Sequence, residues 1–63
     1  MEQRTQLLTV AEVAERLSRS EGQIRWMVSR GTAPRSAKIG GRRYFRADEV
    51  DRYIEEAFAK GIA

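Results

Sequence analysis

Residues 8–31 of this 63-residue chain read LTVAEVAERLSRSEGQIRWMVSRG and contain two helical patterns in succession. In the first, apolar residues recur at the spacing that gathers side chains on one helix face, at Val10, Val13, Ala14 and Leu17. Thr9 followed three residues later by Glu12 is typical of a capping box, and Leu8 and Val13 occupy the two positions of a hydrophobic staple. We therefore predict a helix that begins after Thr9.

The second pattern predicts a helix that begins after Ser20. Gln23 follows this capping residue at the capping-box spacing, and Gly31 is placed to end the helix in a left-handed conformation. The apolar stripe consists of Ile24, Met27 and Val28. Residues 18–20 leave a turn of about three or four residues between two short helices, which is the helix-turn-helix arrangement.

Past Pro34 the sequence changes to short segments around two glycines. Residues 37–39 and 42–45 flank Gly40 and Gly41, and this pattern predicts a β-hairpin. The hairpin would stand beside the two helices as a wing.

The register of the hairpin follows from where its apolar side chains should point. A three-residue loop, residues 40–42, pairs Ile39 with Arg43 and places Ile39 and Phe45 together on the core face, whereas a two-residue loop would separate them. We predict the three-residue loop, which leaves Arg42 at the tip and turns Lys38 and Tyr44 outward.

The last predicted helix runs from about residue 47 to about residue 60. Its apolar stripe is Val50, Ile54, Ala57 and Phe58, with Tyr53 beside it. The fold class is therefore mainly α with a small β-hairpin, a winged helix-turn-helix. We predict a single domain over residues 1–63, with residues 1–6 as a flexible N-terminus.

The composition favours an anionic partner and excludes most catalytic chemistry. Twelve lysines and arginines against nine acids give a formal charge of +3, and the basic residues gather in residues 16–46, which hold nine of them against one acid. Cysteine and histidine are absent, so no disulfide, thiolate metal site or histidine base exists. We expect no enzymatic activity, no cofactor and no metal. With no apolar run of spanning length, we expect an intracellular protein.

The second helix predicts a surface that reads DNA. With its stripe turned inward, its outward face and N-terminal end present polar side chains, as a recognition helix does in a major groove. The predicted contacts are Ser20, Glu21, Gly22, Gln23, Arg25, Trp26, Ser29 and Arg30. Arginine suits guanine and glutamine suits adenine.

Two of these residues have competing interpretations. Glu21 and Arg25 are spaced i, i+4, so Glu21 is explained equally well as half of a surface ion pair and as a DNA contact. Trp26 lies opposite the apolar stripe of its own helix. It can contact DNA, fold under the hairpin as core, or form a protein–protein contact, and we favour DNA.

The wing predicts a second group of DNA contacts, at Lys38, Gly40, Gly41, Arg42 and Arg43. A basic ribbon of this kind can follow a phosphate backbone or place an arginine in the minor groove. The alternative is a solvated turn that is basic only for solubility. The stem of Arg43 points inward in the predicted register, which restricts the reach of this residue to DNA.

The order of motifs resembles the small excisionase (Xis) and AlpA-like family: LTVxEVAxxL in residues 8–17, SxxxIxxMVxxGxxP in residues 20–34 and KIGGRRYFxxxxVxxYI in residues 38–54. The resemblance implies a winged helix related to the DNA-binding part of MerR-type regulators. Residues 20–30 would be the recognition helix and residues 40–43 the wing. Trp26 occupies a position where the family often has an arginine that faces DNA.

The sequence departs from this family in two places. The family's turn usually reads Leu-Gly-Val-Ser, whereas here Ser18 and Arg19 replace the glycine and the buried valine, which exposes Arg19 as a further candidate phosphate contact. Ala33 stands where a larger apolar residue is usual. Both changes predict a more loosely packed turn.

The resemblance also implies a function and partners. Family members include recombination directionality factors of phages, which bind and bend attachment-site DNA and steer an integrase toward excision, while others regulate transcription. The expected partners are double-stranded DNA at an attachment site or operator, an integrase, and further copies of the chain bound side by side. The location that the resemblance implies is the cytoplasm of a bacterial host, at the nucleoid when the protein is bound. A small transcriptional regulator is the alternative function, followed by a protein-interaction adaptor.

Overall fold

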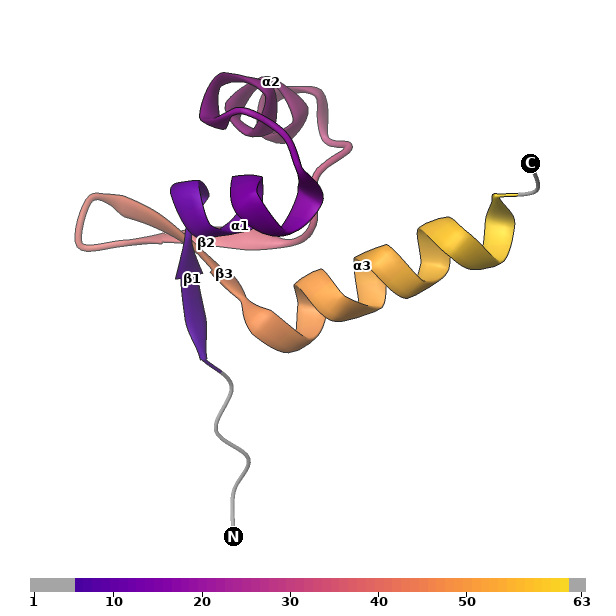
Figure 1. The fold of residues 1–63 in the computed structure, drawn as a ribbon. Coiled ribbons are helices and arrows are strands. Elements are labelled where there is room, and N and C mark those ends of the chain that lie inside the picture. Colours follow the sequence, from indigo (N-terminus) through magenta and orange to yellow (C-terminus); the bar gives the residue numbers. More distant parts are fainter. Residues whose placement is uncertain (1–5, 62–63) are drawn as a thin grey trace, which may run out of the picture.

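The computed structural model describes residues 6–61 and contains three helices and three strands within that part of the chain (Figure 1). They occur in the order β1 (Leu7–Thr9), α1 (Val10–Leu17), α2 (Glu21–Arg30), β2 (Ser36–Ile39), β3 (Arg42–Arg46) and α3 (Ala47–Lys60). Of the segment predicted to be flexible, residues 1–5 lie outside the described residues. Gln6 is held in place, since its carbonyl oxygen accepts a hydrogen bond from the Ala47 N–H at 2.8 Å.

The ends of α1 and α2 confirm the predictions made from capping residues. At the start of α1, the Thr9 N–H donates to the Glu12 carboxylate at 2.8 Å and the Glu12 N–H donates to the Thr9 hydroxyl at 3.2 Å, a complete capping box. Ser20 caps α2 by accepting from the Gln23 N–H at 3.1 Å. Gly31 ends α2 with a positive φ of 77°, the conformation that favours glycine.

The sheet has a strand that the sequence did not predict. Its three antiparallel strands lie in the order β1-β3-β2, with Leu8 opposite Phe45 and Thr9 opposite Tyr44. Leu8 was expected only as a staple residue before α1, and it is buried as a staple should be. A strand of three residues is too short to show the alternation of apolar and polar side chains that predicts a strand, and the partner of β1 lies far away in the sequence.

The predicted hairpin register is wrong. The loop has two residues, Gly40 and Gly41, so that Ile39 pairs with Arg42 and Lys38 with Arg43. The φ angles of the glycines are 60° and 86°, as a two-residue turn with the twist of β-strands requires. This turn geometry outweighs the burial of one isoleucine, which is left 53% exposed.

The observed register moves four side chains. Ile39 lies on the face opposite Phe45 instead of sharing the core face with it. Lys38 and Tyr44 occupy opposite faces, although both were predicted to turn outward together. Arg42 is the first residue of β3 rather than the tip of the loop.

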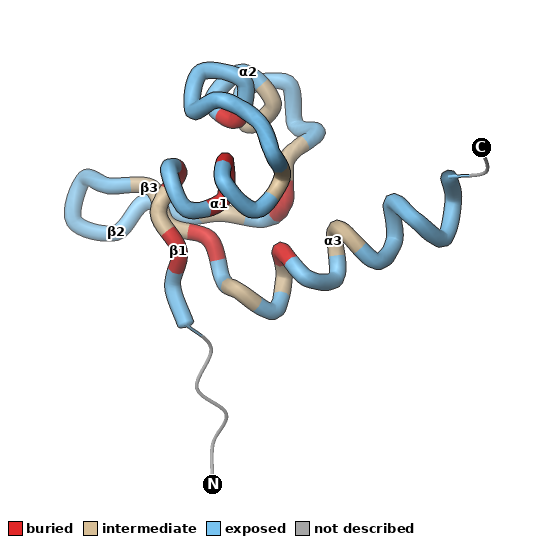
Figure 2. Tube along the Cα trace, in the orientation of Figure 1, coloured by how far each residue is buried: buried red, intermediate tan, exposed pale blue. Residues whose placement is uncertain are grey.

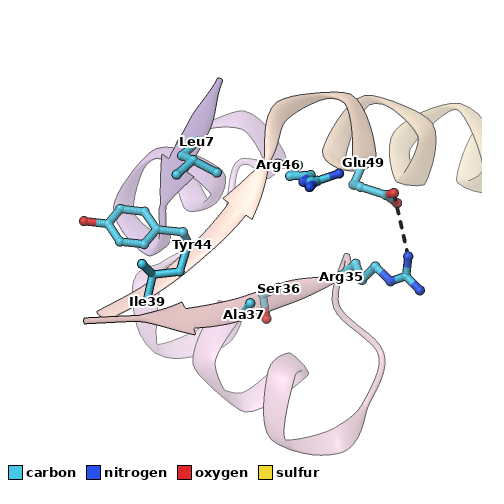
Figure 3. A pocket seen from close by; sticks show the side chains of 8 residues that line it. All are labelled: Leu7, Arg35, Ser36, Ala37, Ile39, Tyr44, Arg46 and Glu49. Carbon is cyan, nitrogen blue, oxygen red and sulfur yellow. Dashed lines mark ion pairs between the residues drawn. The ribbon is translucent and has the colours of Figure 1, made fainter. Parts of the chain in front are cut away.

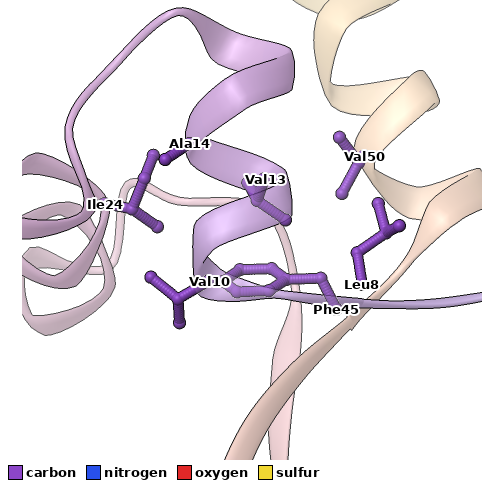
Figure 4. Packing of buried hydrophobic residues seen from close by; sticks show 7 residues of the cluster. All are labelled: Leu8, Val10, Val13, Ala14, Ile24, Phe45 and Val50. Carbon is purple, nitrogen blue, oxygen red and sulfur yellow. The ribbon is translucent and has the colours of Figure 1, made fainter.

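The core lies where α1, α2, the sheet and the start of α3 meet (Figure 4). Its buried hydrophobic residues are Leu8, Val10, Val13, Ala14, Ile24, Phe45 and Val50. Phe45 stands on the central strand and Val50 lies one turn into α3, so the two residues join the sheet and α3 to the same core. None of the helices in the described part of the chain combines the length and the apolarity that a bilayer crossing requires.

Helix α3 leaves the body after its first turns (Figure 2). The Tyr53 hydroxyl donates to the Thr32 carbonyl at 2.8 Å, and Arg16 of α1 pairs with Asp51 at 3.2 Å. Ile54 packs against the core, but each described residue after it is exposed. The predicted apolar stripe is therefore buried only in its first half. Together, the two helices with their short turn and the β2–β3 wing make a winged helix-turn-helix.

Candidate nucleic-acid interface

The orientation of α2 places its polar face on the surface, as predicted. Ile24 is fully buried, and Met27 and Val28 pack against the core. Successive residues of a helix are rotated by about 100°, which places four residues on the face opposite that stripe. These are Gly22, Arg25, Trp26 and Ser29, and all four are exposed. The helix is thus anchored by one face and free to meet a partner with the other.

The start of α2 and the wing border a common hollow. This hollow has a volume of about 550 Å³ and lies between the starts of α1 and α2 and the wing. Its lining consists of Thr9, Val10, Ala11, Glu21, Arg25, Lys38, Gly41, Arg42, Arg43 and Tyr44. Four of these side chains are basic and one is acidic. The surface therefore combines side chains from a helix N-terminus with a basic ribbon, and we call it the helix–wing hollow.

The single acid of the helix–wing hollow is paired with a base. The Arg25 guanidinium lies 3.4 Å from the Glu21 carboxylate, and both side chains are more than half exposed. The structure therefore shows the ion pair that was one interpretation of Glu21. An exposed i, i+4 pair is worth only a few tenths of a kcal/mol, so Arg25 can exchange it for a base or phosphate at little cost.

The two wing arginines differ in freedom. The Arg43 guanidinium donates to the Ser36 hydroxyl at 2.7 Å and is half-buried, on the same face of the sheet as Phe45. Its stem points inward, as predicted. Arg42 is exposed, and no hydrogen bond or ion pair within residues 6–61 engages its side chain. Arg42 is therefore the wing arginine with the greater freedom to reach a phosphate.

Trp26 stands on the surface of α2 and is not core. It is 53% exposed, which excludes burial under the hairpin. The guanidinium carbon of Arg30 lies 5.1 Å from the centre of its ring, within cation–π range. The Ser29 hydroxyl donates to the Trp26 carbonyl at 3.1 Å. One turn earlier, a Cβ at Gly22 would meet only the Ser20 hydroxyl at 3.9 Å, so packing within the chain does not explain this glycine.

The comparison with known protein families agrees with this arrangement. A family model described as a helix-turn-helix domain matches residues 7–57, which is most of the chain. The chain belongs to this helix-turn-helix domain family. Membership indicates a DNA-binding protein, and the family is typically non-enzymatic. Neither the curated proteins nor the solved structures compared with the chain gave a match.

Within this helix-turn-helix domain, the predicted contacts fall into two groups. The helix–wing hollow brings together Glu21, Arg25, Lys38, Gly41, Arg42 and Arg43. The remaining predicted contacts are exposed but do not line the hollow: Arg19, Ser20, Gly22, Gln23, Trp26, Ser29, Arg30 and Gly40. The surface of α2 is therefore wider than the hollow and includes the outward face of its second half.

Four residues that line the helix–wing hollow were not predicted as contacts: Thr9, Val10, Ala11 and Tyr44. Thr9, Val10 and Ala11 border the hollow at the start of α1. Thr9 was recognised as a cap, but its position beside the wing depends on its pairing with Tyr44. Because β1 was not predicted, nothing in the sequence connected these residues with the wing.

Residues 6–61 contain no cluster of three or more Asp, Glu, His or Cys residues that could hold a metal ion.

Proposed function

We propose that this chain binds duplex DNA sequence-specifically, with the N-terminal half of α2 in the major groove and the wing on the adjacent backbone. The observation that carries the proposal is the helix–wing hollow, in which Arg25 of α2 and Lys38 and Arg42 of the wing line one cavity. A recognition helix reads bases with its N-terminal and outward side chains. A basic ribbon beside it supplies the phosphate contacts that fix the register of the helix.

The two halves of this surface have different tasks in the proposal. Arg25 reads a base edge, since a guanidinium matches the two acceptors of guanine in the major groove. Arg42 and Lys38 hold phosphates, which carry no sequence information. Arg43 contributes charge and supports the wing through its bond to Ser36.

The predicted contacts outside the hollow extend this surface. Along the groove these are Trp26, Ser29 and Arg30, and at the N-terminal edge they are Ser20, Gly22 and Gln23. Gly40 and Gly41 let the wing turn close to the backbone, and Arg19 is a further phosphate contact from the turn.

For the biological role, we propose an excisionase-like accessory protein that bends attachment-site DNA and directs an integrase toward excision, without catalysis of its own. The support is the motif order over residues 8–54, which resembles excisionase and AlpA-like proteins. Gel mobility of attachment-site DNA tests this role. A shifted band with the altered mobility of bent DNA is expected, and binding without a bend would contradict an architectural role.

A transcriptional regulator would use the same surface, so a second assay separates the two roles. An excisionase changes the ratio of excised to integrated DNA even when the promoters nearby are silent. A regulator changes the output of a promoter–reporter fusion and leaves that ratio unaltered. A change in recombination products supports the proposed role, whereas a change confined to the reporter supports the regulator.

Salt dependence tests DNA binding itself. If about five phosphates are contacted, the logarithm of the binding constant should fall with the logarithm of salt concentration with a slope of about −4 to −5. Fluorescence anisotropy with a short mixed-sequence duplex measures it. A slope near zero would indicate a protein-interaction adaptor centred on Trp26 instead.

Arg42→Ala tests the task of the wing. Loss of one phosphate contact should weaken binding to all duplexes alike and reduce the magnitude of the salt slope by about 1. Arg52→Ala is the matched control, because Arg52 is an exposed arginine on α3 that does not line the helix–wing hollow. Equal losses for the two variants would show that only net charge matters and would contradict a specific wing contact.

A further inference from the structure

Trp26 is a large apolar side chain on the polar face of α2. Of the four exposed large hydrophobic residues in the described chain, Leu7 and Ile39 lie on the face of the sheet opposite Phe45 (Figure 3), and Phe58 lies on α3. Only Trp26 stands on the helix proposed to enter the major groove, and it is 53% exposed there. An aromatic ring in this position gains much from burial against a partner.

Trp26 has a charged neighbour one turn after it and no side chain one turn before it. The guanidinium carbon of Arg30 lies 5.1 Å from the centre of the indole ring. Gly22 occupies the preceding turn, where an added Cβ would meet only the Ser20 hydroxyl, at 3.9 Å. Helical side chains lean toward the N-terminus, so the Trp26 ring leans toward the turn that holds Gly22. The indole is therefore next to a position that leaves it open to a partner.

An indole recognises a different feature of a base pair from the one that an arginine recognises. Its single polar atom is the Nε1–H donor, and the rest of the ring is apolar. In the major groove every base presents hydrogen-bonding groups, and thymine adds an apolar one, the C5-methyl. Against donors and acceptors the ring would leave these groups without partners, whereas against the methyl it removes apolar surface from water. The chemistry of this side chain therefore selects thymine.

We propose that Trp26 determines specificity by packing its indole against the C5-methyl of one thymine in the major groove. Because α2 must lie in that groove, this inference rests on the proposed function. Arg25 and Trp26 are consecutive, and their Cα atoms are separated by about the distance between successive base pairs, so the thymine should lie within about two base pairs of the guanine that Arg25 reads. Arg25 then reads a polar base edge and Trp26 an apolar one.

The neighbours of Trp26 suit this task. The contact with Arg30 restricts the ring before DNA binds, so less side-chain freedom is lost in the complex. The Arg30 guanidinium can donate to a phosphate while its plane stays on the ring. A side chain in place of Gly22 would compete with the thymine methyl for the space toward which the ring leans.

Removal of one methyl group from the DNA tests the proposal. Each thymine of the preferred duplex is replaced in turn by deoxyuridine, which lacks only the C5-methyl. One replacement, near the guanine read by Arg25, should weaken binding of the wild type about fourfold, the effect of exposing one buried carbon. At the same position 5-methylcytosine should bind about fourfold better than cytosine, because the methyl is the same although the hydrogen-bonding groups differ. Fluorescence anisotropy measures the affinities.

Protein variants test whether the methyl effect belongs to the ring. In Trp26→Ala both methyl effects should vanish, so that thymine and uracil duplexes bind equally, whereas Trp26→Phe keeps an apolar ring and should keep part of the preference. Phe58→Ala, which also truncates an exposed aromatic residue, is the matched control and should bind each duplex as the wild type does. Trp26 and Phe58 are exposed, so circular dichroism should show all variants folded. Effects of the methyl on the duplex itself cancel, since the same DNA pairs are compared for each protein.

The outcomes separate this inference from the proposed function. Equal thymine-to-uracil ratios for the wild type and Trp26→Ala would overturn the inference. If that variant also bound all duplexes more weakly, the ring would contact the sugar–phosphate backbone, and if it bound them normally, the ring would be left for a protein partner. In both cases, salt-dependent binding of the wild type would leave the proposed function standing. A wild type that bound no duplex would contradict the proposed function and this inference together.

Discussion

The Ile24→Ala variant should be largely unfolded under conditions in which the wild type is folded. Ile24 is fully buried between α2 and the rest of the core, which contains only seven buried hydrophobic residues among those described. Truncation of a buried isoleucine to alanine costs about 2–5 kcal/mol. A single core in a chain of this size supplies no more than about 3–5 kcal/mol of net stability. Urea denaturation followed by circular dichroism measures the loss.

Ile39→Ala is the matched control for this prediction. The same atoms are removed, but Ile39 is 53% exposed, on the face of the sheet opposite Phe45. The free energy of unfolding should therefore fall by less than about 1 kcal/mol, within the range of β-propensity differences. Equal losses for the two variants would mean that α2 is not anchored through Ile24.

The second large effect is expected from Arg25→Ala, on DNA recognition. Loss of a bidentate arginine–guanine contact should weaken binding to the preferred sequence by about 1–3 kcal/mol and flatten the preference at one base pair. Binding to a randomised duplex pool, sequenced before and after selection, measures both quantities. A uniform loss on every sequence would mean that Arg25 contacts phosphates rather than a base. It would contradict the proposal that α2 reads bases while the wing holds phosphates.

The partner of Arg25 requires a control of its own. Arg25→Ala leaves the Glu21 carboxylate, 3.4 Å away in the wild type, without its cation and close to the DNA. Part of the lost affinity would then be repulsion between Glu21 and phosphates. The double variant Glu21→Gln with Arg25→Ala removes that repulsion. It should recover some affinity for all sequences but none of the preference at the affected base pair.

The helices were predictable because their signals are local. The capping box at Thr9 and Glu12, the Ser20 cap and Gly31 each lie within a few residues of the turn they control. The apolar spacing then determined which face of α2 is buried, and with it the exposure of Arg25. These features depend on short-range geometry that a single sequence contains.

The sheet was predicted less well because its pairing is not local. Strand β1 has three residues, and Leu8 is defined as a strand residue only by Phe45 across the sheet. The hairpin register was wrong because the burial of Ile39 was assumed. A wing that extends beyond the helices has no core on either face near its tip, so turn geometry decides there.

The candidate site was affected by these errors only in part. Arg42 and Lys38 line the hollow with Arg25 although their register differs from the predicted one. The contribution of the α1 start depended on β1 and was missed. The exposure of Ile39 on the face opposite Phe45 follows from the observed register, whereas the predicted register would have buried it.

Backbone amide chemical shifts during titration with a mixed-sequence duplex test the central claim most directly. If α2 and the wing form the DNA surface, the largest shift changes should occur in residues 20–30 and 38–43. Residues 55–60 at the end of α3 should change little when the titration is carried out with dilute protein. Changes concentrated in α3, with the amides of Arg25 and Arg42 unaffected, would contradict the account.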